Sequence, residues 1–372
     1  MSTTVIDHTL ETFELNLGPQ HPATHGVLRV VLTMDGEYIV KAVPVLGYIH
    51  RMHEKMGETR TWAQFWPNTG RMDYLGALSY NHGYALTVER AAGIEVPERA
   101  EYLRVITVEM NRLASHLLWF GAFVLDLGGF TPLLYAFDDR EIILDLLESV
   151  TGARLTFCYF RFGGVYNDVD DSFLTGCIEF IKRLRSRIPM YHDLVTKNII
   201  LRKRLEGIGI LPPEMCRKYG ATGPVLRGSG VNFDVRKHEP YSVYPEFDFD
   251  IPVYPECDSM ARYMVRMDEM EQSMRIIEQA IAKLPDGPIM PKKKPKLIKP
   301  EKGDYYGNVE AARGSFGMRV ISDGTNTPYR MKLRSPTFSN LSLFGEAAEG
   351  MILADALALM GSLDLVIPEI DR

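Results

Sequence analysis

Two histidines in a short loop are the residues whose types and spacing first suggest chemistry. His21 and His25 lie four positions apart within the stretch 18–26, which reads Gly-Pro-Gln-His-Pro-Ala-Thr-His-Gly. Pro22 follows His21 and biases it toward extended geometry, which argues against a helix carrying both histidines on one face. The bracketing glycines indicate a loop or hairpin tip. Such a loop either presents imidazoles for chemistry or is a tight turn whose histidines cap backbone groups, and spacing alone leaves both open.

Asp126 is a second candidate, because it closes the long apolar helix expected over 97–126. A helix that is apolar on most faces is buried in a large core or against another subunit. No lysine or arginine lies within a helical turn of Asp126, and a buried charge without a partner is costly. Asp126 therefore either pairs with a histidine from the loop or faces water at the helix end near Gly128.

A third candidate is the run Arg71-Met72-Asp73-Tyr74, which we expect to open a helix over 73–92. Asp73 suits an N-cap or first-turn position, where a carboxylate accepts from free backbone N–H groups. Tyr74 is either an ordinary core tyrosine or a proton donor of the kind that a carbonyl acceptor such as a quinone needs.

Several common kinds of site are missing from the sequence. We find no nucleophile elbow, no phosphate-binding loop and no Ser-His-Asp spacing. The four cysteines form no C-x-x-C pair, so no zinc or iron–sulfur site can be identified in this chain, and we expect reduced, buried thiols: Cys158, Cys177, Cys216 and Cys257. The net charge of −6 gives no indication of a nucleic-acid partner. No signal peptide and no membrane span are expected.

The pattern of apolar residues predicts an α+β protein that forms one compact unit in three parts. Residues 1–50 form a small antiparallel sheet carrying the histidine loop, with strands at 12–17, 27–33 and 38–45. Residues 51–206 form a helical bundle, with helices at 73–92, 97–126, 138–150 and two within 170–205. Residues 207–372 comprise an irregular segment to 257, a helix at 258–284, an exposed basic linker at 285–302, strands at 317–322 and 329–334, and a final helix at 344–363.

The motifs together resemble the 49 kDa (D-type) subunit of respiratory complex I, the proton-pumping NADH:quinone oxidoreductase. The resemblance runs from about residue 13 to the C-terminus and rests on long motifs: Leu17-Gly18-Pro19-Gln20-His21-Pro22, Arg71-Met72-Asp73-Tyr74, Arg112-Leu113-Ala114-Ser115-His116-Leu117, Gly163-Gly164-Val165, Gly230-Val231-Asn232, Asp234-Val235-Arg236-Lys237 and Ile370-Asp371-Arg372.

That family shares its fold with the large subunit of nickel–iron hydrogenases, so the resemblance implies a hydrogenase-like fold. The four cysteine ligands of the hydrogenase pattern fall on Asp73, Gly76, Val366 and Glu369, although Glu54 and Arg71 match it. Nickel needs soft thiolate ligands, so we expect no metal in this chain. The resemblance instead implies a quinone headgroup in that place.

For the site, the resemblance implies that His25 and Tyr74 hydrogen-bond the two quinone carbonyls and that His21 belongs to the quinone-binding loop. Asp126 would pair with His25, so His25, Tyr74 and Asp126 are the expected catalytic residues. A histidine that titrates near neutrality and a tyrosine are suitable proton donors. Quinone is a substrate here, and no covalently bound cofactor is expected.

Electrons would arrive from a 4Fe–4S cluster in a neighbouring small subunit, near Arg71, Thr156 and Arg161 of this chain. Many relatives carry a titratable histidine at the position of Thr156, so we expect the cluster potential to depend weakly on pH. Further implied partners are a 30 kDa-type subunit and a membrane-arm subunit, which place the chain peripherally on the cytoplasmic face of the inner membrane.

Two departures leave the electron donor open. The segment 285–303 is shorter than in many relatives, and Met52 replaces a common glycine. A donor such as coenzyme F420H2 or ferredoxin therefore stays an alternative to NADH. The threonine at position 156 separately leaves menaquinone as an alternative to ubiquinone. A scaffold that only docks the cluster subunit onto the membrane arm is the remaining alternative.

Overall fold

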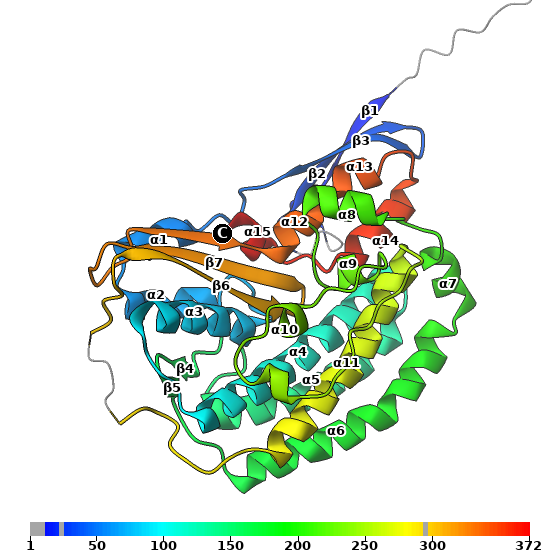
Figure 1. Ribbon diagram of the computed structural model, residues 1–372. Coiled ribbons are helices and arrows are strands. Elements are labelled where there is room, and N and C mark those ends of the chain that lie inside the picture. The colour runs from blue at the N-terminus through cyan, green and yellow to red at the C-terminus, as the bar shows by residue number, and fades with distance from the viewer. Residues whose placement is uncertain (1–11, 22–25, 293–296) are drawn as a thin grey trace, which may run out of the picture.

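The computed structural model describes residues 12–21, 26–292 and 297–372, and it confirms the α+β class. Long helices form one layer, a C-terminal sheet covers one end of it, and an N-terminal sheet projects beside the C-terminal helices (Figure 1). Three antiparallel sheets occur in the described part of the chain, and they have three, two and three strands. His25 and three of the basic residues of the predicted linker lie outside the described residues.

The N-terminal sheet consists of β1 (Phe13–Leu17), β2 (Arg29–Asp35) and β3 (Tyr38–Val45), as the alternating pattern predicted. In β2 every second side chain is buried, namely Val30, Leu32 and Met34. This face packs on a core that also contains Leu341, Leu359 and other apolar side chains from the C-terminal helices. The first and last parts of the chain therefore share one hydrophobic core.

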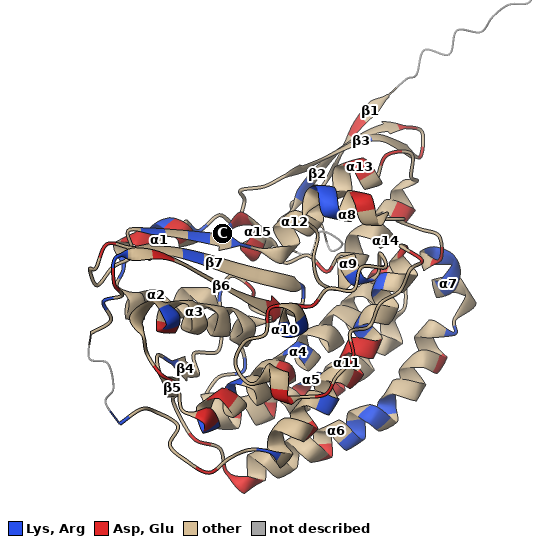
Figure 2. Cartoon of the chain, in the orientation of Figure 1, with Lys and Arg blue, Asp and Glu red and all other residues tan. Residues whose placement is uncertain are grey.

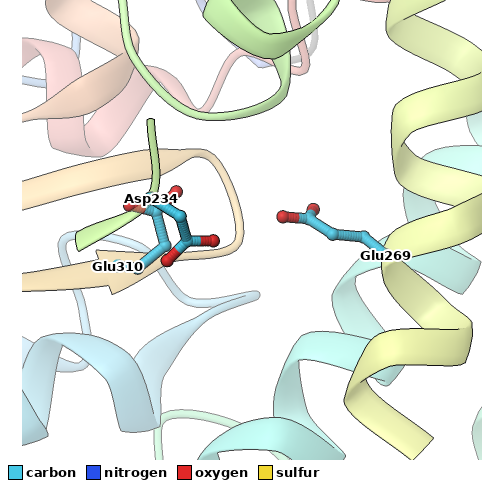
Figure 3. A group of neighbouring side chains, drawn as sticks. All are labelled: Asp234, Glu269 and Glu310. Atoms are coloured by element: carbon cyan, nitrogen blue, oxygen red, sulfur yellow. The ribbon is translucent and has the colours of Figure 1, made fainter. Parts of the chain in front are cut away.

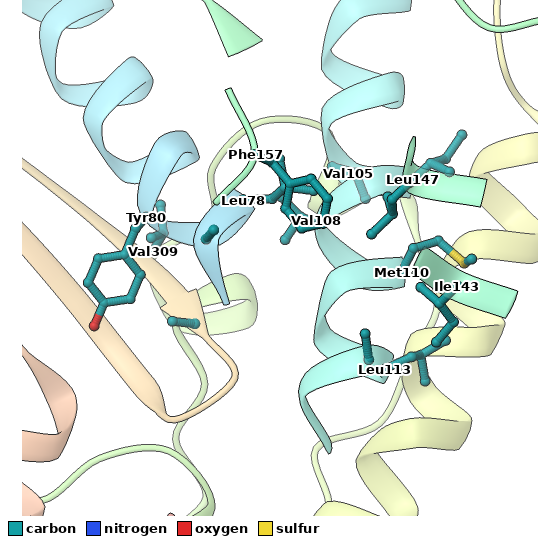
Figure 4. Close-up of a cluster of buried hydrophobic side chains, with 14 of the residues drawn as sticks. Leu78, Tyr80, Val105, Val108, Met110, Leu113, Ile143, Leu147, Phe157 and Val309 are labelled. Atoms are coloured by element: carbon teal, nitrogen blue, oxygen red, sulfur yellow. The ribbon is translucent and has the colours of Figure 1, made fainter. Parts of the chain in front are cut away.

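The helical layer contains α3 (Ala77–Ala92), α4 (Glu98–Asp126), α5 (Phe130–Thr151), α6 (Asp171–Tyr191) and α11 (Ser259–Ala282). The helix α4 is buried along almost its whole length and packs against α5 and α11. Apolar side chains from several of these helices form the larger core, which Figure 4 shows around Val105, Val108 and Leu147. The outer helix α6 carries its basic side chains in its second half (Figure 2).

The C-terminal sheet has the order β6 (Gly303–Ala311), β7 (Gly314–Ser322), β8 (Arg330–Arg334), and β6 and β7 lie on α3. The shorter elements connect these layers: α1 (His53–Thr59), α2 (Trp62–Thr69), β4 (Phe160–Arg161), β5 (Gly164–Val165), a π-helix (His192–Thr196), α7 (Ile199–Leu205), α8 (Pro213–Tyr219), α9 (Pro224–Arg227), α10 (Val235–His238), a 3-10 turn (Tyr244–Glu246), α12 (Pro336–Ser342), α13 (Phe344–Ala347), α14 (Leu353–Ser362) and α15 (Ile367–Asp371).

Two predicted helix starts were wrong, one predicted helix is divided in two, and one strand was not predicted. The helix α3 begins at Ala77 and not at residue 73, and α5 begins at Phe130 and not at 138. Proline is tolerated in the first turn of a helix, so Pro132 does not delay the start of α5. The predicted helix 344–363 is two helices separated at Gly350, whose φ of 78° is a left-handed conformation. The strand β6 was not predicted as a strand separate from β7.

Met52 precedes α1 with φ 56° and ψ 37°. A non-glycine residue in this left-handed region is uncommon and carries steric strain. A glycine, which the family resemblance implies at this place, would adopt the same conformation without strain.

His82 lies in α3 with 1% of its surface exposed, and neither ring nitrogen has a hydrogen-bond partner among the described residues. The rings of Phe160 and Tyr241 pack edge-on against it at 5.7 and 5.4 Å. Burial, together with the charge of Arg104, lowers the pKa of His82 to about 3.

As the pH falls below the ordinary histidine pKa of about 6.5, His82 becomes protonated in the unfolded chain but stays neutral in the folded chain. Protonation therefore stabilises the unfolded state and lowers the free energy of unfolding. We predict that His82→Phe reduces the loss of thermal stability of the full chain between about pH 6.5 and about pH 4. The difference at about pH 8, where the histidine is neutral in both states, measures packing alone and is the control. Parallel pH profiles for the two proteins would contradict this prediction.

Candidate functional site

The histidine loop connects β1 to β2, and its base is narrow. Leu17 pairs with Val30 across the antiparallel strands, and His21 forms an isolated bridge with Gly26. A side chain on Gly26 would lie 3.6 Å from Ile367, at the start of α15. The base of the loop therefore meets the C-terminal segment of the chain. His25 lies outside the described residues, so its expected contacts stay a prediction.

Tyr74 lies in the turn between α2 and α3 and is partly buried. Its hydroxyl group makes no hydrogen bond to another described residue. Burial and the nearby carboxylates of Asp73 and Asp364 raise its pKa, against the effect of Arg313. Tyr74 therefore keeps its proton at neutral pH and has a hydroxyl group available to a ligand.

Asp73 does not cap α3 as predicted, because the N-cap position is occupied by Gly76. One oxygen of Asp73 instead accepts from the N–H groups of Leu75 and Gly76, at 3.1 and 3.0 Å, and shapes the turn that carries Tyr74. A side chain on Gly76 would lie 2.7 Å from this carboxylate, so the turn has room only for glycine at that position. The carboxylate of Asp73 thus has a structural role in placing its neighbour.

Arg313, in the turn between β6 and β7, joins this turn to the rest of the molecule. Its guanidinium lies 2.9 Å from Asp73 and 3.2 Å from Asp364, and it donates to the hydroxyl of Ser115 in α4 at 3.1 Å. Burial alone would lower the pKa of Arg313, but the two carboxylates raise it. Arg313 is not among the residues predicted from the sequence, where its only signal is a charged residue before Gly314 between two strand-like runs.

The structure brings together the regions that hold the four cysteine ligands in the hydrogenase pattern. Asp73 and Gly76 lie beside Arg313, which also binds Asp364 close to Val366. Asp73 in turn acts electrostatically on Glu369. These four places hold two carboxylates, one apolar side chain and one glycine, and none of them holds a thiolate. The guanidinium of Arg313 is bound to one of the carboxylates. These residues do not fit a nickel centre.

Asp126 ends α4 and is exposed in this chain. A hollow beside it, at the turn from α4 to α5, is lined by Val124, Leu127, Phe130 and Ile200. The expected pairing of Asp126 with His25 is not tested, because His25 lies outside the described residues. His21 is likewise exposed, at the base of the loop.

The three residues expected near a partner's cluster lie around one exposed region. Arg71 donates to the carbonyl of Pro67 at 2.5 Å, and Pro67 and Arg161 line the same hollow. Thr156 precedes Phe157, whose carbonyl accepts from Asn81 at 2.7 Å. A side chain on Gly70 would lie 3.3 Å from that carbonyl, so the loop of Thr156 adjoins the loop of Arg71.

A separate group of carboxylates, Asp234, Glu269 and Glu310, is buried in the core, and Glu269 points from α11 toward the other two (Figure 3). Their oxygens lie within 4.8 Å of one another, as in metal sites. Arg227 lies 2.8 Å from Glu310 and also pairs with Glu269, while Arg236 lies 2.7 Å from Asp234. The guanidinium groups already occupy these carboxylates, so the group is a salt-bridge network.

The charges in this network explain the protonation of its members. Burial opposes ionisation of Glu269, but Arg227 and His116 lower its pKa below the usual range. Burial and the carboxylate of Asp234 raise the pKa of Glu310. His116, 2.9 Å from Glu269, has its pKa lowered by burial.

We predict that Arg313→Lys lowers the free energy of unfolding of the full chain by about 3 kcal/mol, measured in urea. Lysine keeps the charge but lacks the planar fork that reaches both Asp73 and Asp364, so one buried carboxylate loses its partner. The matched control is Arg319→Lys in the neighbouring strand, whose exposed pair with Asp304 should matter little. Equal effects of the two substitutions would rule out a special role for Arg313.

None of the described helices combines the length and hydrophobicity needed to cross a membrane.

Comparisons with known proteins agree with the motifs. A family model described as the 49 Kd subunit of the respiratory-chain NADH dehydrogenase matches residues 126–372. The NADH-quinone oxidoreductase D subunit of Desulfotalea psychrophila is 72% identical over 372 residues, which is 100% of both chains. A D-type subunit of the same enzyme from Opitutus terrae is 66% identical over 97% of this chain and 91% of its own length. The corresponding D subunit of Syntrophobacter fumaroxidans is 58% identical over 98% of both chains. The chain therefore belongs to the family of 49 kDa subunits of the respiratory-chain NADH dehydrogenase.

Proposed function

We propose that this chain forms the quinone-reducing site of a proton-translocating NADH:quinone oxidoreductase, with the quinone headgroup between the loop 18–26 and Tyr74. The observation that carries the proposal is the Tyr74 hydroxyl, which makes no hydrogen bond to another described residue and is presented by a turn that Asp73 and Arg313 fix. The names of the relatives support the same reaction and favour NADH as the electron donor.

Quinone reduction consumes two electrons and two protons. Tyr74 donates a hydrogen bond to one carbonyl oxygen and releases its proton to that oxygen as electrons arrive. His25 serves the other carbonyl, and Asp126 stabilises the charged imidazole through an ion pair. The change in charge of this His25–Asp126 pair on quinol formation is the event that biases a conformational change in the membrane arm.

The electrons come from a 4Fe–4S cluster held by a neighbouring small subunit, which docks where Arg71, Thr156 and Arg161 adjoin. Two guanidinium groups facing the cluster favour its reduced, more negative state. Threonine does not titrate, so Thr156 gives the cluster potential little dependence on pH. A 30 kDa-type subunit and a membrane-arm subunit complete the surroundings, at the cytoplasmic face of the inner membrane.

We predict that Tyr74→Phe in the assembled complex lowers the rate of quinone reduction by about a hundredfold, because the substitution removes a general acid and little else. The electron paramagnetic resonance signal of the terminal cluster should persist, which shows that assembly and electron entry are intact. His25→Ala should behave similarly.

The matched control is Tyr80→Phe in α3, which removes a hydroxyl that is buried, without a hydrogen-bond partner among the described residues, and stacked on Phe316. This variant should retain full activity. If Tyr74→Phe also retains full activity, the quinone site lies elsewhere and the chain acts as a docking scaffold.

A further inference from the structure

We propose that the carboxyl group of Glu369 is the proton reservoir of the site, and that it returns a proton to Tyr74 after Tyr74 has protonated the quinone. This inference rests on the proposed function. Glu369 lies in α15, which follows the segment that carries Asp364 and begins at Ile367 beside the base of the histidine loop. The C-terminal segment therefore borders the site, although it lies far from Tyr74 in the sequence.

Three acidic side chains meet in this region, and only two of them have a cationic partner among the described residues. Asp73 and Asp364 each bind Arg313, at 2.9 and 3.2 Å. Glu369 is fully buried, and no lysine, arginine or histidine of the described residues lies within ion-pair distance of it. A buried carboxyl group without a cation, next to a second carboxylate, is neutral because both burial and like charge oppose ionisation.

The two oxygens of Glu369 differ in their hydrogen bonds, and from this difference we infer which one carries the proton. Its Oε1 accepts from the backbone N–H of Thr337 at 3.1 Å and from the Thr337 hydroxyl. Its Oε2 is buried and has no hydrogen-bond partner among the described residues. The proton therefore sits on Oε2, where the O–H group is a donor without an acceptor in the described part of the chain. Such a group is positioned to bond a water molecule or a substrate.

The charged groups around Glu369 agree with this assignment. Burial, and then the carboxylate of Asp73, raise the pKa of Glu369 well above the usual range. The hydrogen bond from Thr337 and the charge of Arg372 oppose this rise but do not cancel it. Glu310 also has a raised pKa, but it lies 2.8 Å from Arg227 in the separate salt-bridge network.

The proposed step balances in atoms and charge. The quinone receives two electrons from the partner's cluster and one proton from the Tyr74 hydroxyl, which leaves a tyrosinate. The O–H bond of Glu369 then breaks, its proton passes to the tyrosinate oxygen through water, and Glu369 becomes a carboxylate. Tyrosinate is the stronger base, so the transfer is favourable. Solvent restores the proton to Glu369 before the next turnover.

Glu369→Gln in the assembled complex tests this role, because glutamine keeps the acceptor for Thr337 and a donor at Oε2 but has no proton to give. We expect the rate of quinone reduction to fall by roughly tenfold or more, with little change in KM for quinone and an unchanged cluster signal. Glu369→Asp should restore part of the activity. Full activity of Glu369→Gln would mean that Glu369 only joins α15 to α12, and would overturn the proposal.

A second readout does not depend on activity. The infrared spectrum of the wild-type complex should contain the C=O stretch of a protonated carboxyl group that shifts in heavy water, and Glu369→Gln should lack this band. If Glu369→Gln does not assemble, Glu369→Asp replaces it and must shift the band. A band that is unaltered in these variants would overturn the proposal.

Asp371→Asn controls for general disturbance of α15, because Asp371 accepts from the N–H groups of Gly47 and Ile49, both at 2.9 Å. This variant should keep the infrared band. Tyr74→Phe separates the two hypotheses. If Tyr74→Phe is inactive while Glu369→Gln is fully active, the quinone site stands and only the reservoir role fails. If Tyr74→Phe is fully active, the proposed function itself fails.

Discussion

The site depends on the buried ion pairs that the guanidinium of Arg313 makes with Asp73 and Asp364. This guanidinium joins three segments that lie far apart in the sequence: the turn of Asp73 before α3, the β6–β7 turn, and the C-terminal segment of Asp364. Because these groups are buried, losing the guanidinium would leave the carboxylate of Asp73 without a cationic partner among the described residues, which is costly. The same contact fixes the turn that presents Tyr74 and brings α15 to the base of the histidine loop.

The helix α4 explains how so many charges can be buried near this site. Its sequence places Arg104, Glu109, Arg112 and Ser115 at intervals of three to five residues, and all four are buried. Each charged group has a partner: Arg104 binds Glu89 and Arg112 binds Glu109, and Glu109 also binds Arg236. Two kinds of buried acid result. Most are ionised and locked to arginines, while Glu369 lacks an ion-pair partner in the described chain and is free to hold a proton.

Much of the fold could be predicted from local patterns, and less of the site. The strand Tyr38–Val45 and the helices α4 and α11 follow from alternation or helical spacing within one segment. Tyr74 was found because its motif is contiguous in the sequence. Arg313 was not, because its bond to Asp73 joins residues 240 positions apart and no local pattern indicates it. The start of α5 was missed because exposed apolar residues such as Phe130 and Leu134 obscure the helical period. The break between α13 and α14 was missed because the apolar pattern continues across Gly350, which adopts a left-handed conformation.

The central claim is that a quinone headgroup binds against Tyr74, and the most direct measurement is a structure of the assembled complex with quinone bound. We expect one carbonyl oxygen of the headgroup to accept a hydrogen bond from the Tyr74 hydroxyl at about 2.7 Å, with Asp73 still bound to Arg313. A headgroup bound at another place, with the Tyr74 hydroxyl in contact only with protein or water, would contradict it.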